Sequence, residues 1–307
     1  MSGTPPGALA RFLASDLWFS FTSSRVAMGA ALVGSLCMLC ALFAGWVAPH
    51  DPFDLATLEL GDSMLPPAWT DGGRWTYLLG TDEQGRDVLS ALFFGARISL
   101  LIGAAAVLLS LLIGVTLGLV SGYVGGGLDA FIMRVCDVML SFPSILVALL
   151  INGAGRALFP TAQGTLAFGV VVFAIALTGW VPYARTVRAS TLVERDKDYV
   201  LAARVIGVPP LRIMRRHVLP NVLGPVLVLA TLQVGGAILI EATLSFLGVG
   251  VPPTSPSLGT FINEGNKQLL GGAWWLVVFP GGMLVAIALS INLFGDWLRD
   301  ALNPRLR

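Results

Sequence analysis

The chain has 307 residues, of which 55% are hydrophobic and only 12% are charged, and its formal net charge is +1 at pH 7. A soluble domain typically carries roughly 25% charged residues, so the composition excludes an ordinary soluble protein. Most of the chain is expected to face lipid or other helices, and the near-neutral balance gives no support to nucleic-acid binding. The two histidines are far apart and the three cysteines lie in apolar runs, so no metal site or disulfide framework is expected.

Uncharged stretches define the candidate membrane spans. A helix needs about 20 mostly apolar residues to cross a bilayer, because each residue rises only about 1.5 Å. Four uncharged stretches are long enough, and they cover 26–49, 98–128, 157–184 and 268–295. Two further candidates are 131–155, which carries Arg134 and Asp137 near one end, and 217–240. The sequence therefore predicts an all-α, polytopic membrane protein with six transmembrane helices.

The loop charges predict the orientation. Lys and Arg gather in the cytoplasmic loops of membrane proteins. With six spans, both termini and the second and fourth connections share one side, which holds most of the 19 Lys and Arg residues. Both termini are therefore expected in the cytoplasm. Residues 1–92 are expected to form a cytoplasmic segment, the first transmembrane helix and a long, acidic outer loop, and residues 93–307 a five-helix core with a polar connection at 185–219.

Two features interrupt the apolar spans. Phe142-Pro143 falls in the third span, where proline removes a backbone hydrogen bond and kinks the helix. The kink is interpreted either as a packing feature or as a bend that lines a pathway. Glu241 lies at the end of the fifth span, and carboxylates in a membrane are costly and usually face a cavity or a partner. It is interpreted either as a gate or as a hydrogen-bonding link between the helix and the next loop.

A seventh uncharged stretch, 242–263, is not expected to cross the membrane. It contains Pro252, Pro253 and Pro256 together with several glycines, which break a helix. Its first half is expected to complete the fifth span, and the remainder is expected to form a loop.

The polar connection at 185–219 predicts a short surface helix. Asp198 is expected to cap a helix that begins near Tyr199, and Gly207 with the two following prolines is expected to end it. Val200, Ala203 and Ile206 fall on one face at helical spacing, and a second helix is expected from Pro210 toward Pro220. Ala202 and Ala203 are small, so another backbone could approach the helix closely.

This connection resembles the EAA loop of ABC importer permeases, in which Glu-Ala-Ala is followed at fixed spacing by Gly and by Ile-x-Leu-Pro. Ala202-Ala203, Gly207 and Leu219-Pro220 fall in the same register, while Leu201 stands at the Glu position and His217 at the Ile position. The segments 79–90, 95–100, 122–129, 244–250 and 295–304 resemble, in the same order, the second permease subunit of dipeptide and oligopeptide importers. The likeness covers the chain from about residue 15.

The resemblance implies a type I ABC importer permease in a bacterial inner membrane. Its partners would be membrane lipid, a homologous second permease, two cytoplasmic ATP-binding subunits and an extracytoplasmic solute-binding protein. The permease would not be an enzyme and would hold no cofactor or metal, because ATP and Mg would be bound by the ATPases; no G-x-x-x-x-G-K-[ST] phosphate loop occurs in the sequence. The resemblance places the ATPase-docking residues at Tyr199, Ala202, Ala203, Arg204, Gly207 and Val208.

Some assignments stay open at this level. Asp82, Arg86 and Asp87 are interpreted either as a hydrogen-bonded turn or as a contact for the binding protein. The substrate could be a dipeptide, a longer peptide, nickel, glutathione or haem, because the binding protein is expected to set specificity. The alternative function is an ATP-independent secondary transporter or channel, which should show several ionisable residues in its spans or matched broken helices in two halves.

Overall fold

The computed structural model describes residues 16–54, 60–158, 165–252 and 254–302. Regular structure in these residues is helical, and the β-structure found there is one isolated bridge between Thr81 and Asp87. The long apolar helices are α3 (Arg25–Leu42), α5 (Val88–Val124), α8 (Thr165–Glu194), α11 (Leu219–Phe246) and α13 (Trp275–Leu302). The shorter helices are α2 (Asp16–Ser23), α4 (Ala44–Val47), α6 (Gly126–Ser141), α7 (Ser144–Leu158), α9 (Asp198–Val205), α10 (Pro210–Ile213) and α12 (Leu258–Gln268).

The prediction of six spans is confirmed by length and composition. Five helical segments of the described chain are long and apolar enough to cross a membrane. A sixth span results when the bent pair α6 and α7, whose two helices meet at an angle of 95°, is counted as one span. The third span is therefore broken at Phe142-Pro143, where a kink within one helix was expected. Phe142 has an extended backbone at the end of α6, and Pro143 precedes the first turn of α7.

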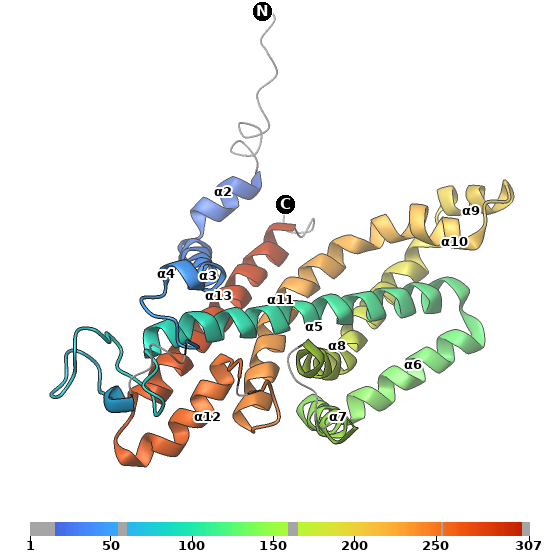
Figure 1. Cartoon of the computed structure of the whole chain (residues 1–307). Helices are drawn as coiled ribbons and strands as arrows, with labels where there is room; N and C mark the ends of the chain where they lie inside the picture. Colours follow the sequence, from blue (N-terminus) through green and yellow to red (C-terminus); the bar gives the residue numbers. More distant parts are fainter. Residues whose placement is uncertain (1–15, 55–59, 159–164, 253, 303–307) are drawn as a thin grey trace, which may run out of the picture.

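Helix α5 is the central element, and it packs most closely against α8 (Figure 1). Gly114, Gly118 and Gly122 recur every four residues on α5 and lie against the α8 backbone. A Cβ atom at Gly114 would come within 2.5 Å of the Trp180 carbonyl oxygen, and one at Gly118 within 2.4 Å of the Ala184 carbonyl oxygen. This glycine stripe lets two backbones approach as in other membrane helix pairs, so the contact depends on the absence of side chains.

Both α5 and α8 extend beyond the predicted spans. Helix α5 begins at Val88 and not near residue 98, because the Asp87 carboxylate accepts a hydrogen bond from the Ser90 amide at 3.0 Å and caps the helix there. Helix α8 continues through Arg188, whose Nε lies 2.5 Å from Asp129 Oδ1 on α6. Arg188 can therefore lie inside α8, because the Asp129 carboxylate pairs with it.

Two local predictions are wrong. The loop expected in the second half of 242–263 contains the start of α12, since the Ser257 and Thr260 side chains form a capping box just after the last proline. Asp198 is the first residue of α9 and not its cap, which is Lys197. The helix expected from Pro210 toward Pro220 is present, and it continues into the fifth span because a π-helical turn at Met214–Val218 joins α10 to α11.

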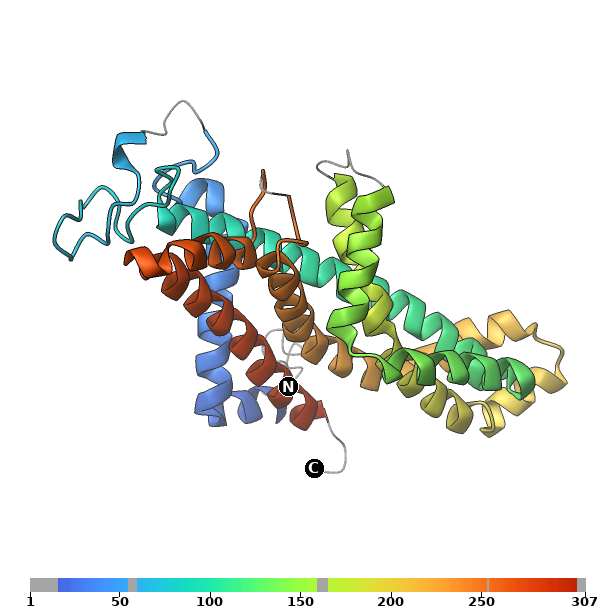
Figure 2. The ribbon, with the colours of Figure 1, turned by 90° about the horizontal axis from the view of Figure 1, so that it is seen from below.

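The two ends of α5 carry different structures. The loop that contains residues 60–87 lies at one end together with α12, and α9 with α10 lies at the other (Figures 1 and 2). Helix α2 lies near the C-terminal end of α13, where the rings of Phe21 and Trp297 are 5.1 Å apart. The candidate sites are thus separated by the length of the central helix.

Candidate functional sites

The short helix α9 is fastened to its own chain along one face. Val200 and Ala203 are 0% and 5% exposed and belong to the main apolar core. Ala203 therefore cannot provide a docking surface for another protein, whereas Ala202 is exposed. Ile206 was expected on the same face as Val200 and Ala203, but it is 78% exposed because the helix ends at Val205 and the chain turns.

Polar contacts hold α9 at both ends. The Tyr199 hydroxyl donates a hydrogen bond to Glu194 and accepts one of 3.0 Å from the Asn221 amide. Burial, followed by the bond to Glu194, raises the pKa of Tyr199 to about 12. The Arg204 guanidinium lies 5.0 Å from the ring centre of Tyr123 near the end of α5. Tyr199 and Arg204 thus position α9 on α8, α11 and α5.

Gly207 ends α9 as the sequence predicts. Its φ of +77° lies in the left-handed region, which glycine adopts without steric cost. The Val208 amide donates to the Ala203 carbonyl oxygen at 3.0 Å, and the Gly207 amide donates to the Arg204 carbonyl oxygen at 3.0 Å. The bond from Val208 back to Ala203 is the kind that closes a Schellman turn. A Cβ at Gly207 would meet no atom within 4 Å, so the constraint is the backbone conformation alone.

Helices α9 and α10 expose large apolar side chains beside charged ones. The coupling patch, as we call it, is formed by four exposed side chains: Leu201, Val205, Ile206 and Leu211. Val205 is 86% exposed, and Leu201 lies one helical turn before it on the same face. A group of large exposed hydrophobic residues on a water-facing segment indicates an interface with another protein. The sequence signal for this patch was Val205-Ile206 directly before the helix-ending glycine.

The break between α6 and α7 is exposed. Phe142 is 58% exposed, and the backbone around Pro143 faces away from the rest of this chain. The Pro143 carbonyl oxygen accepts bonds of 3.0 and 3.2 Å from the amides of Leu146 and Val147, so it begins α7. This elbow offers an apolar surface in the membrane region that another helix or a pathway could use.

Glu241 is fully buried and hydrogen-bonded. Ser99 Oγ donates to Glu241 Oε2 at 2.8 Å, and Ser245 Oγ donates to Oε1 at 2.7 Å. Ser99 Oγ in turn lies 3.4 Å from the Leu258 amide at the start of α12. The carboxylate therefore joins α5, α11 and α12, which favours the interpretation as a helix-to-loop link over that as a gate.

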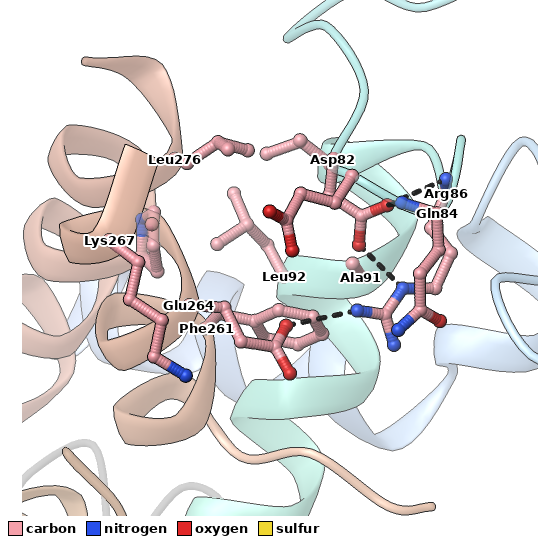
Figure 3. A pocket seen from close by; sticks show the side chains of 13 residues that line it. Asp82, Gln84, Arg86, Ala91, Leu92, Phe261, Glu264, Lys267 and Leu276 are labelled. Atoms are coloured by element: carbon pink, nitrogen blue, oxygen red, sulfur yellow. Dashed lines mark hydrogen bonds and ion pairs between the residues drawn. The ribbon is translucent and has the colours of Figure 1, made fainter. Parts of the chain in front are cut away.

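Asp82, Arg86 and Asp87 form a buried turn. Their exposed fractions are 8%, 4% and 3%, and Arg86 Nε lies 2.5 Å from Asp82 Oδ2. Arg86 Nη2 also lies 3.0 Å from Glu264 Oε2 on α12, and the guanidinium is 5.4 Å from the Phe261 ring centre (Figure 3). Because these side chains are occupied and buried, they do not form a direct contact surface for a binding protein. Sequence reasoning missed Glu264, which lies 178 positions after Arg86.

A polar pocket of about 160 Å³ lies beside this turn, between the start of α5, α12 and α13. Glu83, Gln84 and Lys267 on its wall are exposed, whereas Glu264 lies deeper. Burial raises the pKa of Glu264, and the neighbouring Arg86 acts in the opposite direction. The accessible charges of this pocket are therefore at its rim and not in the turn beneath it.

Comparison with known proteins agrees with this architecture. Residues 114–307 match the family model described as "Binding-protein-dependent transport system inner membrane component", and residues 13–67 match "N-terminal TM domain of oligopeptide transport permease C". The di/tripeptide transport system permease protein DppC of Pseudomonas aeruginosa is 43% identical over 95% of this chain and 92% of its own. The dipeptide transport system permease protein DppC of Haemophilus influenzae is 40% identical over 100% of both chains.

A solved structure of the MetNI methionine ABC transporter, in an inward-facing conformation, shares the fold. Its matching chain has a TM-score of 0.53 at 19% identity, and the likeness covers 70% of this chain and 98% of that chain. The α-helical, multi-span architecture, the resemblance in the polar connection and the family match agree with one another. The chain therefore belongs to the family of binding-protein-dependent transport system inner membrane components, the permease subunits of bacterial ABC importers.

Proposed function

We propose that this chain is the second permease subunit of an ABC importer for dipeptides or short oligopeptides. The observation that carries the proposal is its 40% identity to a dipeptide transport permease over the full length of both chains. Together with a homologous permease it forms the translocation pathway. An extracytoplasmic binding protein delivers the peptide, and two cytoplasmic ATPases bind ATP and Mg and drive the cycle.

The coupling patch on α9 and α10 is the ATPase-docking surface in this proposal. Its four apolar side chains are exposed although the segment faces water, and Arg212, Arg215 and Arg216 beside it are also exposed. Burial of such side chains in a partner's groove is favourable by about 1.5–3 kcal/mol for each fully buried residue. Tyr199, Ala203, Arg204, Gly207 and Val208 act indirectly by fixing the position of α9.

The other exposed surfaces of the chain are assigned to contacts with the second permease and the binding protein. The exposed elbow at Phe142-Pro143 faces the second permease or the pathway between the two subunits. The pocket rim at Glu83, Gln84 and Lys267 contacts the binding protein, and the buried turn at Asp82, Arg86 and Asp87 holds that rim in place. Glu241 fixes the helix junction, so it gives little support to an ATP-independent secondary transporter, which needs ionisable groups along a pathway.

The proposal includes cytoplasmic termini. Single cysteines at Asp71 and at Lys197, placed in a chain from which the three native cysteines have been removed, should react from opposite faces of the inner membrane. A membrane-impermeant reagent should label the Asp71 position in intact spheroplasts and the Lys197 position only after lysis. Labelling of both positions from outside would contradict the orientation.

Growth on a peptide tests the substrate class. In a host that lacks this chain and requires one amino acid, growth should fail when that amino acid is supplied as a dipeptide and should be normal when it is supplied free. The wild-type chain should restore growth on the dipeptide. Normal growth on the dipeptide without the chain, in a strain with no other peptide importer, would contradict the proposal.

A further inference from the structure

Arg97 is an exposed arginine in the outer half of α5 that the proposed function does not use. It directly precedes the uncharged run 98–128. Arg86, Arg185 and Arg188 each have an acidic partner, whereas no ion pair joins Arg97 to another residue of the described chain. Other exposed arginines, such as Arg134, also lack an ion pair in the described chain, so what distinguishes Arg97 is the groove beside it. An arginine next to an apolar span is stable when an anion meets it.

The Arg97 side chain lies on the wall of an apolar groove. The groove has a volume of about 410 Å³ and runs between α3, α5, α11 and α13. Arg97 is its single charged lining residue, and Thr231, its single hydroxyl, donates to the backbone carbonyl of Val228 at 2.7 Å. The apolar residues that line the groove include Met38, Leu42, Leu101, Ala104, Ile291 and Phe294.

In the proposed orientation, Arg97 lies near the interface between the outer leaflet of the inner membrane and water. The amide of His50, just after the first span, lies 3.1 Å from Ser90 Oγ, so Ser90 is level with the outer end of that span. Arg97 lies two helical turns farther along α5, about 10 Å along its axis. Helix α5 is inclined to α3, which reduces the depth below the surface (Figure 2). A long arginine side chain can reach the phosphate layer from such a position.

We propose that this groove binds one anionic phospholipid of the outer leaflet, whose phosphate pairs with Arg97 and whose acyl chain lies along the groove. A guanidinium matches phosphate in a bidentate geometry. A peptide fits less well, because its amine and amides would find no polar partners on this wall. The inference does not depend on what the transporter carries, but the choice of the outer leaflet rests on the proposed orientation of the chain.

Lipid retention by the full-length chain tests this proposal. The purified protein in mild detergent is titrated with dioleoylphosphatidylglycerol or dioleoylphosphatidylethanolamine, and bound lipid is counted by native mass spectrometry. The wild type should retain one phosphatidylglycerol in preference to phosphatidylethanolamine. Arg97→Gln should lower phosphatidylglycerol retention about fivefold, since one basic residue near an anionic lipid surface contributes about 1 kcal/mol. Arg97→Lys should retain most of the preference.

Two further variants make the test specific. Ala104→Phe fills the groove but keeps Arg97, so it should lower phosphatidylglycerol retention to a similar extent, and it serves as the test if Arg97→Gln yields no folded protein. Arg134→Gln removes an exposed arginine from α6, away from the groove, and should change nothing. Equal retention of the two lipids by the wild type, or retention unaffected by either Arg97→Gln or Ala104→Phe, would overturn the proposal.

Discussion

The two ends of the central helix use charged and apolar residues in opposite ways. At the end that carries residues 60–87 and α12, which is the outer end in the proposed orientation, Arg86 is paired with Asp82 and Glu264 in a packed junction, and the charges stabilise the fold. At the other end, the large side chains of Val205 and Ile206 are exposed, whereas the small side chain of Ala203 is buried. Residue polarity alone would have placed the charged residues on an exposed interface and the apolar residues in the core. What identifies an interface here is the mismatch between residue type and exposure.

The largest effect is expected at the outer end. Arg86→Ala leaves Asp82 and Glu264 without their common partner, and removing one member of a buried ion pair typically costs 3–5 kcal/mol, so we expect a loss of about that size in stability. Thermal unfolding of the detergent-purified chain measures it. Glu83→Gln at the exposed rim is the matched control and should leave the unfolding temperature unchanged. Equal stability of Arg86→Ala and the wild type would show that the buried turn does not stabilise the fold.

The inner end should respond in the opposite manner. Val205→Asp in the coupling patch should leave the stability of the chain unchanged but weaken ATPase binding about 10- to 100-fold, because the lost burial amounts to about 1.5–3 kcal/mol. Co-purification of the ATPases, with titration of the isolated subunits, measures the loss. Leu270→Asp is the control, since Leu270 is equally apolar and fully exposed next to α12. If Val205→Asp retains normal ATPase affinity, α9 does not dock through this face.

Ala202 and Ala203 sharpen the comparison within a single helix. Ala203→Leu should overpack the core beneath α9 and cost about 1–3 kcal/mol of stability. Ala202→Leu places the same atoms on the exposed side and should affect ATPase binding without lowering stability. Unfolding temperature and ATPase titration of both variants separate the two outcomes. Similar stability losses in both would mean that α9 is rotated relative to the structure.

A smaller effect is expected at Gly207. Gly207→Val must adopt a positive φ, which costs an ordinary residue about 1–2 kcal/mol and is harder for a branched side chain. Because no atom crowds the position, the effect should be confined to the end of α9. We expect faster amide exchange at positions 207 and 208 and weaker ATPase binding. Gly248 also has a positive φ with open space around it and serves as the control for a turn outside the docking surface. Unchanged exchange at residue 208 would contradict the role of Gly207 as the helix end.

The spans could be predicted from the sequence because the bilayer thickness sets a minimum length for an uncharged run. Their ends could not, because they depend on residues distant in sequence. Arg188 remains inside α8 because Asp129 pairs with it across 59 positions. Helix α12 was missed because prolines mark where a helix stops but do not prevent another from starting at Ser257.

The short helix α9 and its glycine end lie where the sequence predicts them, since Gly207 and the alanines keep a recognisable spacing, and the role of this helix in docking stays a prediction. The sequence did not predict which face of α9 is exposed, because contacts with Tyr123 and Asn221 on other helices set the side of α9 that packs inward. The outer turn was left between two interpretations for the same reason. Glu264, which completes it, belongs to a helix that the local pattern did not reveal.

Dipeptide uptake into proteoliposomes tests the central claim most directly. The chain is reconstituted with its partner permease and ATPases, and a labelled dipeptide is supplied with the binding protein outside and ATP inside. The account predicts accumulation that requires ATP hydrolysis and that is abolished or strongly reduced by Val205→Asp. Uptake that proceeds without ATP, or that is unaffected by Val205→Asp, would contradict it.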